Sequence, residues 1–136
     1  MTKIFLDAAY AIALAAPKDQ YHERAKALAV QLEKDQTRLI TTRAVVLEIG
    51  NALAKFKYRV QAIELLNPLE GDSGIEIVPI SERLVKRAFA LYKERPDKEW
   101  GMTDCISFIV MQEQGLSDTL TTDEHFRQAG YNALLL

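Results

Sequence analysis

Cysteine is almost missing from this chain, since Cys105 is the one cysteine among 136 residues. A single thiol excludes an intrachain disulfide and a zinc cage built from several thiolates. It also favours a reducing compartment, which we take to be the cytoplasm. Cys105 opens a largely apolar segment, residues 105–111, and this position predicts a packed thiol in the core.

An excess of positive charge is missing as well. Lys and Arg number 17 and Asp and Glu number 19, which gives a formal net charge of −2. This balance argues against a protein that grips nucleic acid by bulk positive charge. It leaves open a protein that reaches phosphates through a metal ion. With 49% hydrophobic and 26% charged residues, the composition is that of a globular protein and excludes a disordered chain.

Long apolar runs are absent too. The longest, residues 8–16, is too short to span a bilayer, so we expect no membrane contact. Residues 4–16 have some features of a signal peptide, but Asp7 inside this segment argues against one. No repeat, low-complexity tract or flexible linker divides the chain. Because a domain typically has about 150 residues, we predict one domain over residues 1–136.

Short apolar segments alternate with helical patterns along the chain. This alternation predicts an α/β fold, a twisted and mostly parallel sheet of about five short strands flanked by helices. The expected strands are residues 4–6, 39–41, 75–79, 120–121 and 133–136. The expected helices are residues 8–15, 21–34, 43–56, 61–66, 82–94, 104–114 and 123–129.

Capping residues and breakers set the expected ends of several helices. Thr41 or Thr42 is expected to cap helix 43–56, and Thr103 to cap helix 104–114, because threonine is a favoured N-cap. Pro68 is expected to end helix 61–66, because the residue before a proline avoids the helical conformation. Helix 104–114 is apolar nearly all round, which places it at the centre of the fold.

Four acids follow strands or lie on helices near the same predicted edge of the sheet. In open parallel sheets, ligands bind beyond the carboxyl ends of the strands. Asp7 follows the first strand, Asp123 follows the fourth, and Asp104 opens helix 104–114. Glu48 lies among apolar neighbours on helix 43–56, with Asn51 about one turn further on the same face. Taken alone, each acid also fits a helix cap or a solvated surface charge.

Taken together, the four acids predict a metal site. Two carboxylates about 5 Å apart repel by roughly 3 kcal/mol at an effective dielectric of 20. A group of four therefore needs a proton or a cation. Oxygen ligands without a set of His or Cys suit Mg²⁺ or Mn²⁺. Such a site typically binds phosphate oxygens and activates water.

Four segments carry a resemblance to a known family. They are residues 4–7, Glu48 with Asn51, residues 100–108 (Trp-Gly-Met-Thr-Asp-Cys-Ile-Ser-Phe) and residues 121–126 (Thr-Thr-Asp-Glu-His-Phe). In their order and spacing, the segments resemble PIN-domain ribonucleases, particularly VapC-type toxins of prokaryotic toxin–antitoxin pairs. The resemblance covers nearly the whole chain and implies a single PIN-like domain.

The resemblance also implies an activity and partners. Asp7, Glu48, Asp104 and Asp123 would take the family's metal-site positions, and Ser107 matches a small hydroxyl often found there. Family members cleave RNA with Mg²⁺ or Mn²⁺ and water as the nucleophile, usually form homodimers, and are silenced by a cognate antitoxin. The chain departs from the family at Ala8, where a Thr or Ser often follows the first acid. The sequence therefore predicts a metal-dependent endoribonuclease, with Asn51 and Thr103 in supporting positions.

Two other functions remain open from the sequence. A catalytically silent PIN-like module would bind RNA or a protein without turnover, and Ala8 favours this alternative. A phosphatase with an Asp nucleophile would use Asp7, but such enzymes usually need a second Asp two residues later, where Ala9 stands.

Several other residues have a structural or a functional interpretation. Residues 55–59 (Lys-Phe-Lys-Tyr-Arg) fit either a contact with RNA or a solvated helix end with one buried aromatic. His22 and His125 show no ligand spacing and are interpreted as structural or surface residues. Trp100 and Phe126 are expected to be packing anchors.

Overall fold

The sheet has five strands, all parallel, in the order β3-β2-β1-β4-β5. This arrangement comes from a computed structural model that describes residues 2–72 and 74–136. It confirms the predicted α/β fold with a parallel sheet. The strands are β1 (Lys3–Leu6), β2 (Arg38–Thr42), β3 (Ile75–Val78), β4 (Asp118–Leu120) and β5 (Asn132–Ala133).

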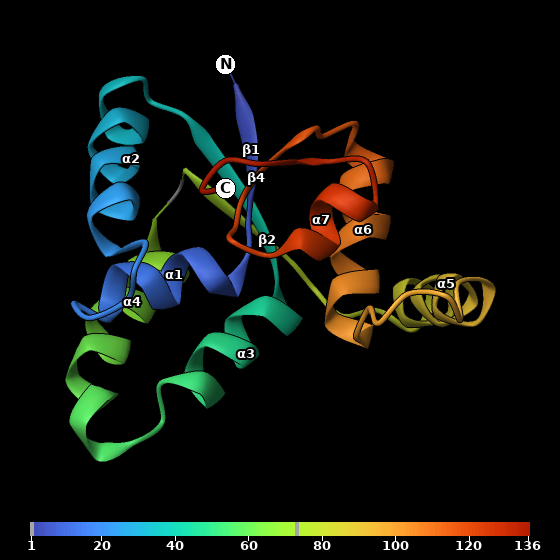
Figure 1. Ribbon diagram of the computed structural model, residues 1–136, viewed down its shortest axis with the longest axis horizontal. Coiled ribbons are helices and arrows are strands. Elements are labelled where there is room, and N and C mark those ends of the chain that lie inside the picture. Colours follow the sequence, from blue (N-terminus) through green and yellow to red (C-terminus); the bar gives the residue numbers. More distant parts are fainter. Residues whose placement is uncertain (1, 73) are drawn as a thin grey trace.

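Helices flank the sheet on both sides, as Figure 1 shows, with α1, α2 and α4 on one side and α6 and α7 on the other. Helix α5 packs against α6, and α3 lies near the ends of β1 and β2. The helices are α1 (Ala8–Ala15), α2 (His22–Lys34), α3 (Arg43–Ala52), a 3₁₀ helix η1 (Phe56–Tyr58), α4 (Arg59–Gly71), α5 (Glu82–Glu94), α6 (Met102–Gln114) and α7 (Glu124–Gln128).

The core lies on both faces of the central strand, β1, and of its neighbour β4. Phe5 and Leu120 are completely buried, and so is Phe126 of α7. Helix α6 is buried from Cys105 to Met111, which confirms its predicted central position and the packed state of Cys105. This rigid centre fixes where β1, β4 and α6 end or begin, and those three places carry three of the four acids considered below.

Three predicted helix boundaries are wrong. Helix α3 ends at Ala52, and a separate 3₁₀ turn follows where the sequence predicted helix up to residue 56. Helix α4 runs through Pro68 to Gly71, because a proline in the last turn removes few helical hydrogen bonds and the burial of Leu69 offsets that loss. Helix α6 begins two residues earlier than predicted, so Thr103 lies inside it and Gly101 is the N-cap.

The other helix boundaries agree closely with the sequence. The first helix has the predicted bounds, and the Thr42 hydroxyl accepts a hydrogen bond from the Val45 amide as the N-cap of α3. Two strands differ most from the prediction: the fourth covers Asp118–Leu120 instead of residues 120–121, and the last covers Asn132–Ala133 instead of residues 133–136. Within the described residues, no helix has both the length and the apolar character needed to cross a membrane.

Candidate metal centre

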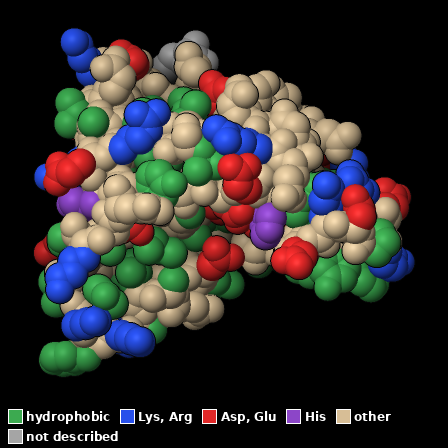
Figure 2. Space-filling model, viewed as in Figure 1, with side chains coloured by type: hydrophobic (Ala, Val, Ile, Leu, Met, Phe, Trp, Pro, Cys, Tyr) green, Lys and Arg blue, Asp and Glu red, His purple; other side chains and the backbone are tan. Residues whose placement is uncertain are grey.

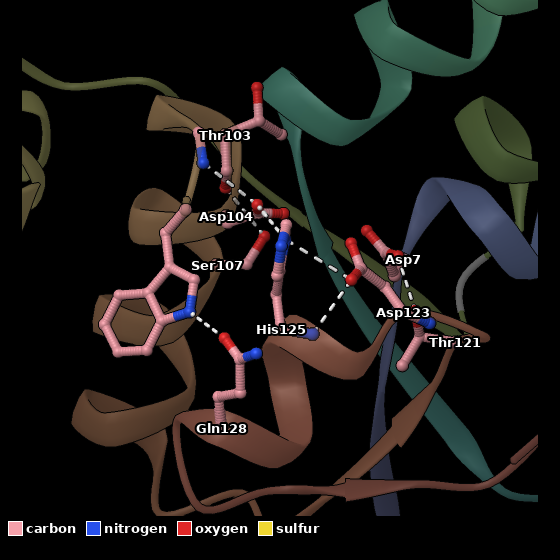
Figure 3. Close-up of polar contacts among 10 residues, drawn as sticks. Asp7, Thr103, Asp104, Ser107, Thr121, Asp123, His125 and Gln128 are labelled. Atoms are coloured by element: carbon pink, nitrogen blue, oxygen red, sulfur yellow. Dashed lines mark hydrogen bonds and ion pairs between the residues drawn. The ribbon is translucent and has the colours of Figure 1, made fainter. Parts of the chain in front are cut away.

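The four predicted acids come together at the carboxyl edge of the sheet. β1 and β4 are parallel neighbours, so Asp7 after β1 and Asp123 after β4 leave the sheet side by side. Asp104 lies in the first turn of α6, and Glu48 lies on α3. Figure 3 shows Asp7, Asp104 and Asp123 turned toward one region. In Figure 2, Asp and Glu side chains gather around a hollow, beside a histidine. We call these four residues the acid site.

Asp7 has the most unusual environment of the four. Its side chain is buried, with 5% of the residue exposed. Desolvation raises the pKa of Asp7 to about 7, and the nearby carboxylates of Glu48 and Asp104 act in the same direction. A hydrogen bond from the Thr121 hydroxyl opposes the rise but does not cancel it. Asp7 is therefore an acid that the protein alone does not stabilise in its charged form.

Glu48 and Asp104 are perturbed in the same direction. Partial desolvation raises the pKa of Glu48, and the Asp104 and Asp123 carboxylates raise it further. The pKa of Asp104 is also raised, first by desolvation and then by Asp123, although the Gly101 amide and His125 oppose this. Because the acids affect one another in this way, the structure brings all four into one electrostatic group.

Positive charge that would neutralise this group is scarce. Across residues 2–72 and 74–136, no Lys or Arg forms an ion pair with any residue of the acid site. The donor set is thus rich in carboxylate oxygen and lacks a built-in arginine or lysine counter-ion. Such a donor set fits a hard divalent cation such as Mg²⁺ or Mn²⁺.

Thr121 joins two of the acids. Its hydroxyl donates a hydrogen bond of 2.7 Å to Asp7 Oδ2 and accepts one of 3.0 Å from the Asp123 amide. The hydroxyl is completely buried. Thr121 was not predicted as a site residue, although it stands two residues before Asp123. It supplies Asp7 with a hydroxyl partner, while Ala8 cannot.

His125 lies among the acids, a position that was not predicted from the sequence. Its Nδ1 is 3.2 Å from Asp104 Oδ2 and 3.3 Å from Asp123 Oδ1. Its backbone amide donates a hydrogen bond of 2.9 Å to Asp123 Oδ1, which is the N-cap contact of α7. These contacts are compatible with the predicted structural role of His125, and they also place its imidazole beside two predicted metal ligands. The available signal was its position two residues after Asp123 in the first turn of a helix.

The predicted supporting residues lie in the neighbourhood but differ in their contacts. The Ser107 hydroxyl is buried and donates to the Thr103 carbonyl oxygen at 3.0 Å. Thr103 does not cap α6, but its side chain lies near Glu48 and acts to lower the pKa of that acid. The Asp104 carboxylate instead accepts the Gly101 amide at 3.0 Å and fixes the start of α6. Asn51 is exposed on α3, one turn beyond Glu48.

Aromatic packing holds α6 and α7 in place under the acid site. The Phe108 ring packs edge-on against Trp100 and Phe126, with ring centroids 5.0 and 4.9 Å away. The Trp100 indole also donates a hydrogen bond of 3.0 Å to Gln128 Oε1. Trp100 and Phe126 are buried, which confirms their prediction as packing anchors. This packing fixes the relative positions of Asp104 and His125.

A separate groove of about 730 Å³ lies between α1, α2 and α4, bounded by residues such as Tyr10, Leu32 and Leu65. None of the four acids lines it. The acid site therefore lies outside this groove.

Fold and site together define an α/β domain with carboxylates gathered at the carboxyl edge of a parallel sheet. A family model for the PIN domain matches residues 4–131. The chain therefore belongs to the PIN domain family, as the sequence resemblance implied. No curated protein sequence matches the chain.

Solved structures show the same fold. The chain is similar to VapC20 of Mycobacterium tuberculosis, described as a Sarcin-Ricin loop cleaving toxin, with a TM-score of 0.82 and 21% identity over 94% of this chain and 95% of that one. It is similar to VapBC2 of Rickettsia felis, solved with a DNA fragment from their promoter, with a TM-score of 0.70 and 14% identity over 97% and 96% of the two chains. FitAcB of Neisseria gonorrhoeae gives a TM-score of 0.67 and 19% identity over 96% and 95%.

Proposed function

We propose that this chain is a metal-dependent endoribonuclease that cleaves RNA phosphodiester bonds at the acid site, as the toxin of a toxin–antitoxin pair. The observation that carries the proposal is the convergence of four acids, one of them buried, without a Lys or Arg partner among the described residues. Membership in the PIN domain family and likeness to a toxin described as cleaving the Sarcin-Ricin loop support RNA as the substrate class.

The acids would have different roles. Asp7 and Asp104 are proposed as direct ligands of Mg²⁺ or Mn²⁺, Glu48 as a ligand or the base that positions water, and Asp123 as a ligand or an outer partner. A bound divalent ion would polarise the scissile phosphate and lower the pKa of the attacking water. The chain itself holds the carboxylates in place: Thr121 orients Asp7, and the Gly101 amide orients Asp104.

The test is incubation of the purified protein with transfer and messenger RNA, with and without EDTA. We expect cleavage by the wild type with Mg²⁺ or Mn²⁺, and none with EDTA or in Asp7→Asn. Asp35→Asn, at the exposed end of α2, is the matched control and keeps full activity. Cleavage that survives both EDTA and Asp7→Asn, with contaminating nuclease excluded, would contradict the proposal.

A catalytically silent RNA- or protein-binding module is the alternative from the sequence, and Ala8 is the feature that favoured it. Thr121 supplies a hydroxyl to Asp7 in this structure, so a missing hydroxyl at position 8 is a weak reason to expect inactivity. Calorimetric titration discriminates between the two functions. A protein that binds no metal at millimolar Mg²⁺ or Mn²⁺ would fit the silent module.

Two protein partners belong to the proposal: a cognate antitoxin and a second copy of this chain. The likeness to VapBC2 supports the antitoxin, and several apolar side chains remain exposed on α3, η1 and α4, with Phe56 98% exposed. We expect a short antitoxin gene beside this one and a product that co-purifies with this chain. Sedimentation of the free protein tests the homodimer. A cytoplasmic location is proposed from the single cysteine.

A further inference from the structure

We propose that His125 is a nitrogen ligand of the metal ion at the acid site, and that this imidazole makes the site prefer Mn²⁺ to Mg²⁺. The inference rests on the proposed function, because it concerns the same metal. It goes further in naming a ligand that is not an acid and in choosing between two cations.

The geometry places one imidazole nitrogen against two carboxylates from different parts of the fold. His125 Nδ1 is 3.2 Å from Asp104 Oδ2, on α6, and 3.3 Å from Asp123 Oδ1, before α7. One ligand atom from each of the three residues lies within 4.8 Å of the others. In Figure 3 the imidazole of His125 points between Asp104 and Asp123. Three donor atoms at such spacings face a common point.

This position is held by the fold rather than by chance contact of a mobile side chain. His125 lies next to Phe126, which is completely buried and packs against the Phe108 ring of α6. The His125 amide is hydrogen-bonded to Asp123 Oδ1, so the backbone of one ligand orients the carboxylate of the other. Pre-ordered donors of this kind lose little freedom when a cation binds.

The two contacts have a metal-free form and a metal-bound form. Without a metal, one proton on Nδ1 can be shared between the two carboxylate oxygens, which lie at nearly equal distances from it. With that proton removed, the nitrogen and both carboxylates can donate electron pairs to one divalent cation. The same three atoms are therefore already placed to hold a cation.

The nitrogen donor decides the choice of cation. Mg²⁺ binds almost exclusively to oxygen and keeps several waters, whereas Mn²⁺, a transition-metal ion, also accepts imidazole nitrogen. The four carboxylates of the acid site alone would serve either ion. With His125 added, the site gains a bond that favours Mn²⁺.

The experiment is pulsed electron paramagnetic resonance of Mn²⁺ bound to the full chain, which detects a directly coordinated ¹⁴N nucleus. The chain has two histidines, so His22→Asn is a matched control for His125→Asn. His22 lies at the start of α2, where its Nδ1 is 2.8 Å from the Ala13 carbonyl oxygen. Calorimetric titrations with Mn²⁺ and with Mg²⁺ accompany the spectra.

We expect nitrogen coupling in the wild type and in His22→Asn, and its loss in His125→Asn. The Kd for Mn²⁺ should rise at least about 10-fold in His125→Asn, while the Kd for Mg²⁺ changes much less. Should His125→Asn fail to fold, coupling that persists in His22→Asn still assigns the nitrogen to His125, because no other histidine exists.

Two results would overturn the inference, and they differ in what else they affect. Mn²⁺ that binds to the wild type without nitrogen coupling, or equal losses of Mn²⁺ and Mg²⁺ affinity in His125→Asn, would remove His125 as a selecting ligand and leave the metal site intact. Failure of the wild type to bind either cation would overturn both the inference and the proposed function.

Discussion

Helix α6 carries an acid near each end, and the surroundings of the two acids are opposite. Near its start, Asp104 faces other carboxylates, and desolvation together with Asp123 raises its pKa. Near its end, Glu113 pairs with Arg83 at 2.7 Å and with Arg87, both on α5, and these partners lower its pKa. The charge of Glu113 is balanced within the protein. The negative charge of Asp104 is only partly balanced by His125, so a bound cation would stabilise it.

The comparison is tested most strongly by activity. Asp104→Asn should reduce RNA cleavage by more than about 100-fold, because it removes a proposed metal ligand and losses of even the outer partners of ligands typically cost about 10–100-fold. Glu113→Gln, the matched change near the other end of the same helix, should keep activity close to that of the wild type. Rates of cleavage of a labelled RNA in Mg²⁺ or Mn²⁺ measure both. Equal activity of the two variants would contradict a functional difference between Asp104 and Glu113.

The next effect is on stability and its dependence on pH. Folded Asp7 keeps its proton up to a pKa of about 7, whereas the unfolded chain releases it near 3.8. Unfolding in this interval therefore releases a proton, so the contribution of Asp7 to stability falls as pH rises from about 4 to about 7. Above pH 7, the charged Asp7 side chain lowers the free energy of unfolding by about 4 kcal/mol, at about 1.36 kcal/mol per pKa unit.

Asp7→Asn should remove this cost. Urea unfolding in EDTA at pH 5 and at pH 8 measures this effect. We expect the free energy of unfolding of the variant to increase relative to that of the wild type as the pH rises. Added Mn²⁺ should stabilise the wild type more at pH 8 than at pH 5, because the ion competes with protons for the carboxylates. A difference between variant and wild type that stays constant from pH 5 to pH 8 would show that Asp7 titrates normally.

A smaller effect is expected from the hydroxyl that joins the acids. Thr121→Val keeps the shape of the side chain but removes the hydrogen bond to Asp7 Oδ2 and leaves the Asp123 amide without its acceptor. We expect a loss of about 10–100-fold in cleavage or in metal affinity. Thr121→Ser, which restores the hydroxyl, should recover most of the activity. If Val and Ser behave alike, the hydroxyl has no part in orienting Asp7.

The smallest effect concerns Glu113 itself. Its pKa is lowered in the folded protein, so its ion pairs add stability above the ordinary pKa of a glutamate, and this contribution is lost as pH falls. Because such pairs lie at the surface, Glu113→Gln should lower the Tm only slightly at pH 7 and by less in acid. Thermal unfolding monitored by circular dichroism checks this, and a large loss of stability would mean that the pairs with α5 are structural.

The sequence was informative about the fold because its signals are local. Alternating apolar runs predicted the parallel sheet, and the bounds of α1 follow from its alanine-rich composition and the following Pro17. Boundaries failed where tertiary packing decides. Helix α4 passes through Pro68 because Leu69 is buried, and α6 begins before Thr103 because the Asp104 side chain holds the Gly101 amide.

The candidate site was only partly visible in the sequence. The four acids were predictable because each stands at a strand exit or on a helix near the same edge. Thr121 and His125 were not, because their importance depends on the direction of their side chains and on distances across the fold. Ser107 was predicted from the resemblance, yet its hydroxyl donates its hydrogen bond to the Thr103 carbonyl oxygen.

The most direct test of the central claim is a calorimetric titration of Mg²⁺ or Mn²⁺ into the wild type, Asp104→Asn and Glu113→Gln. The account predicts saturable binding to the wild type and to Glu113→Gln, and none that is measurable for Asp104→Asn. Absence of binding to the wild type at millimolar metal, or unchanged binding by Asp104→Asn, would contradict it.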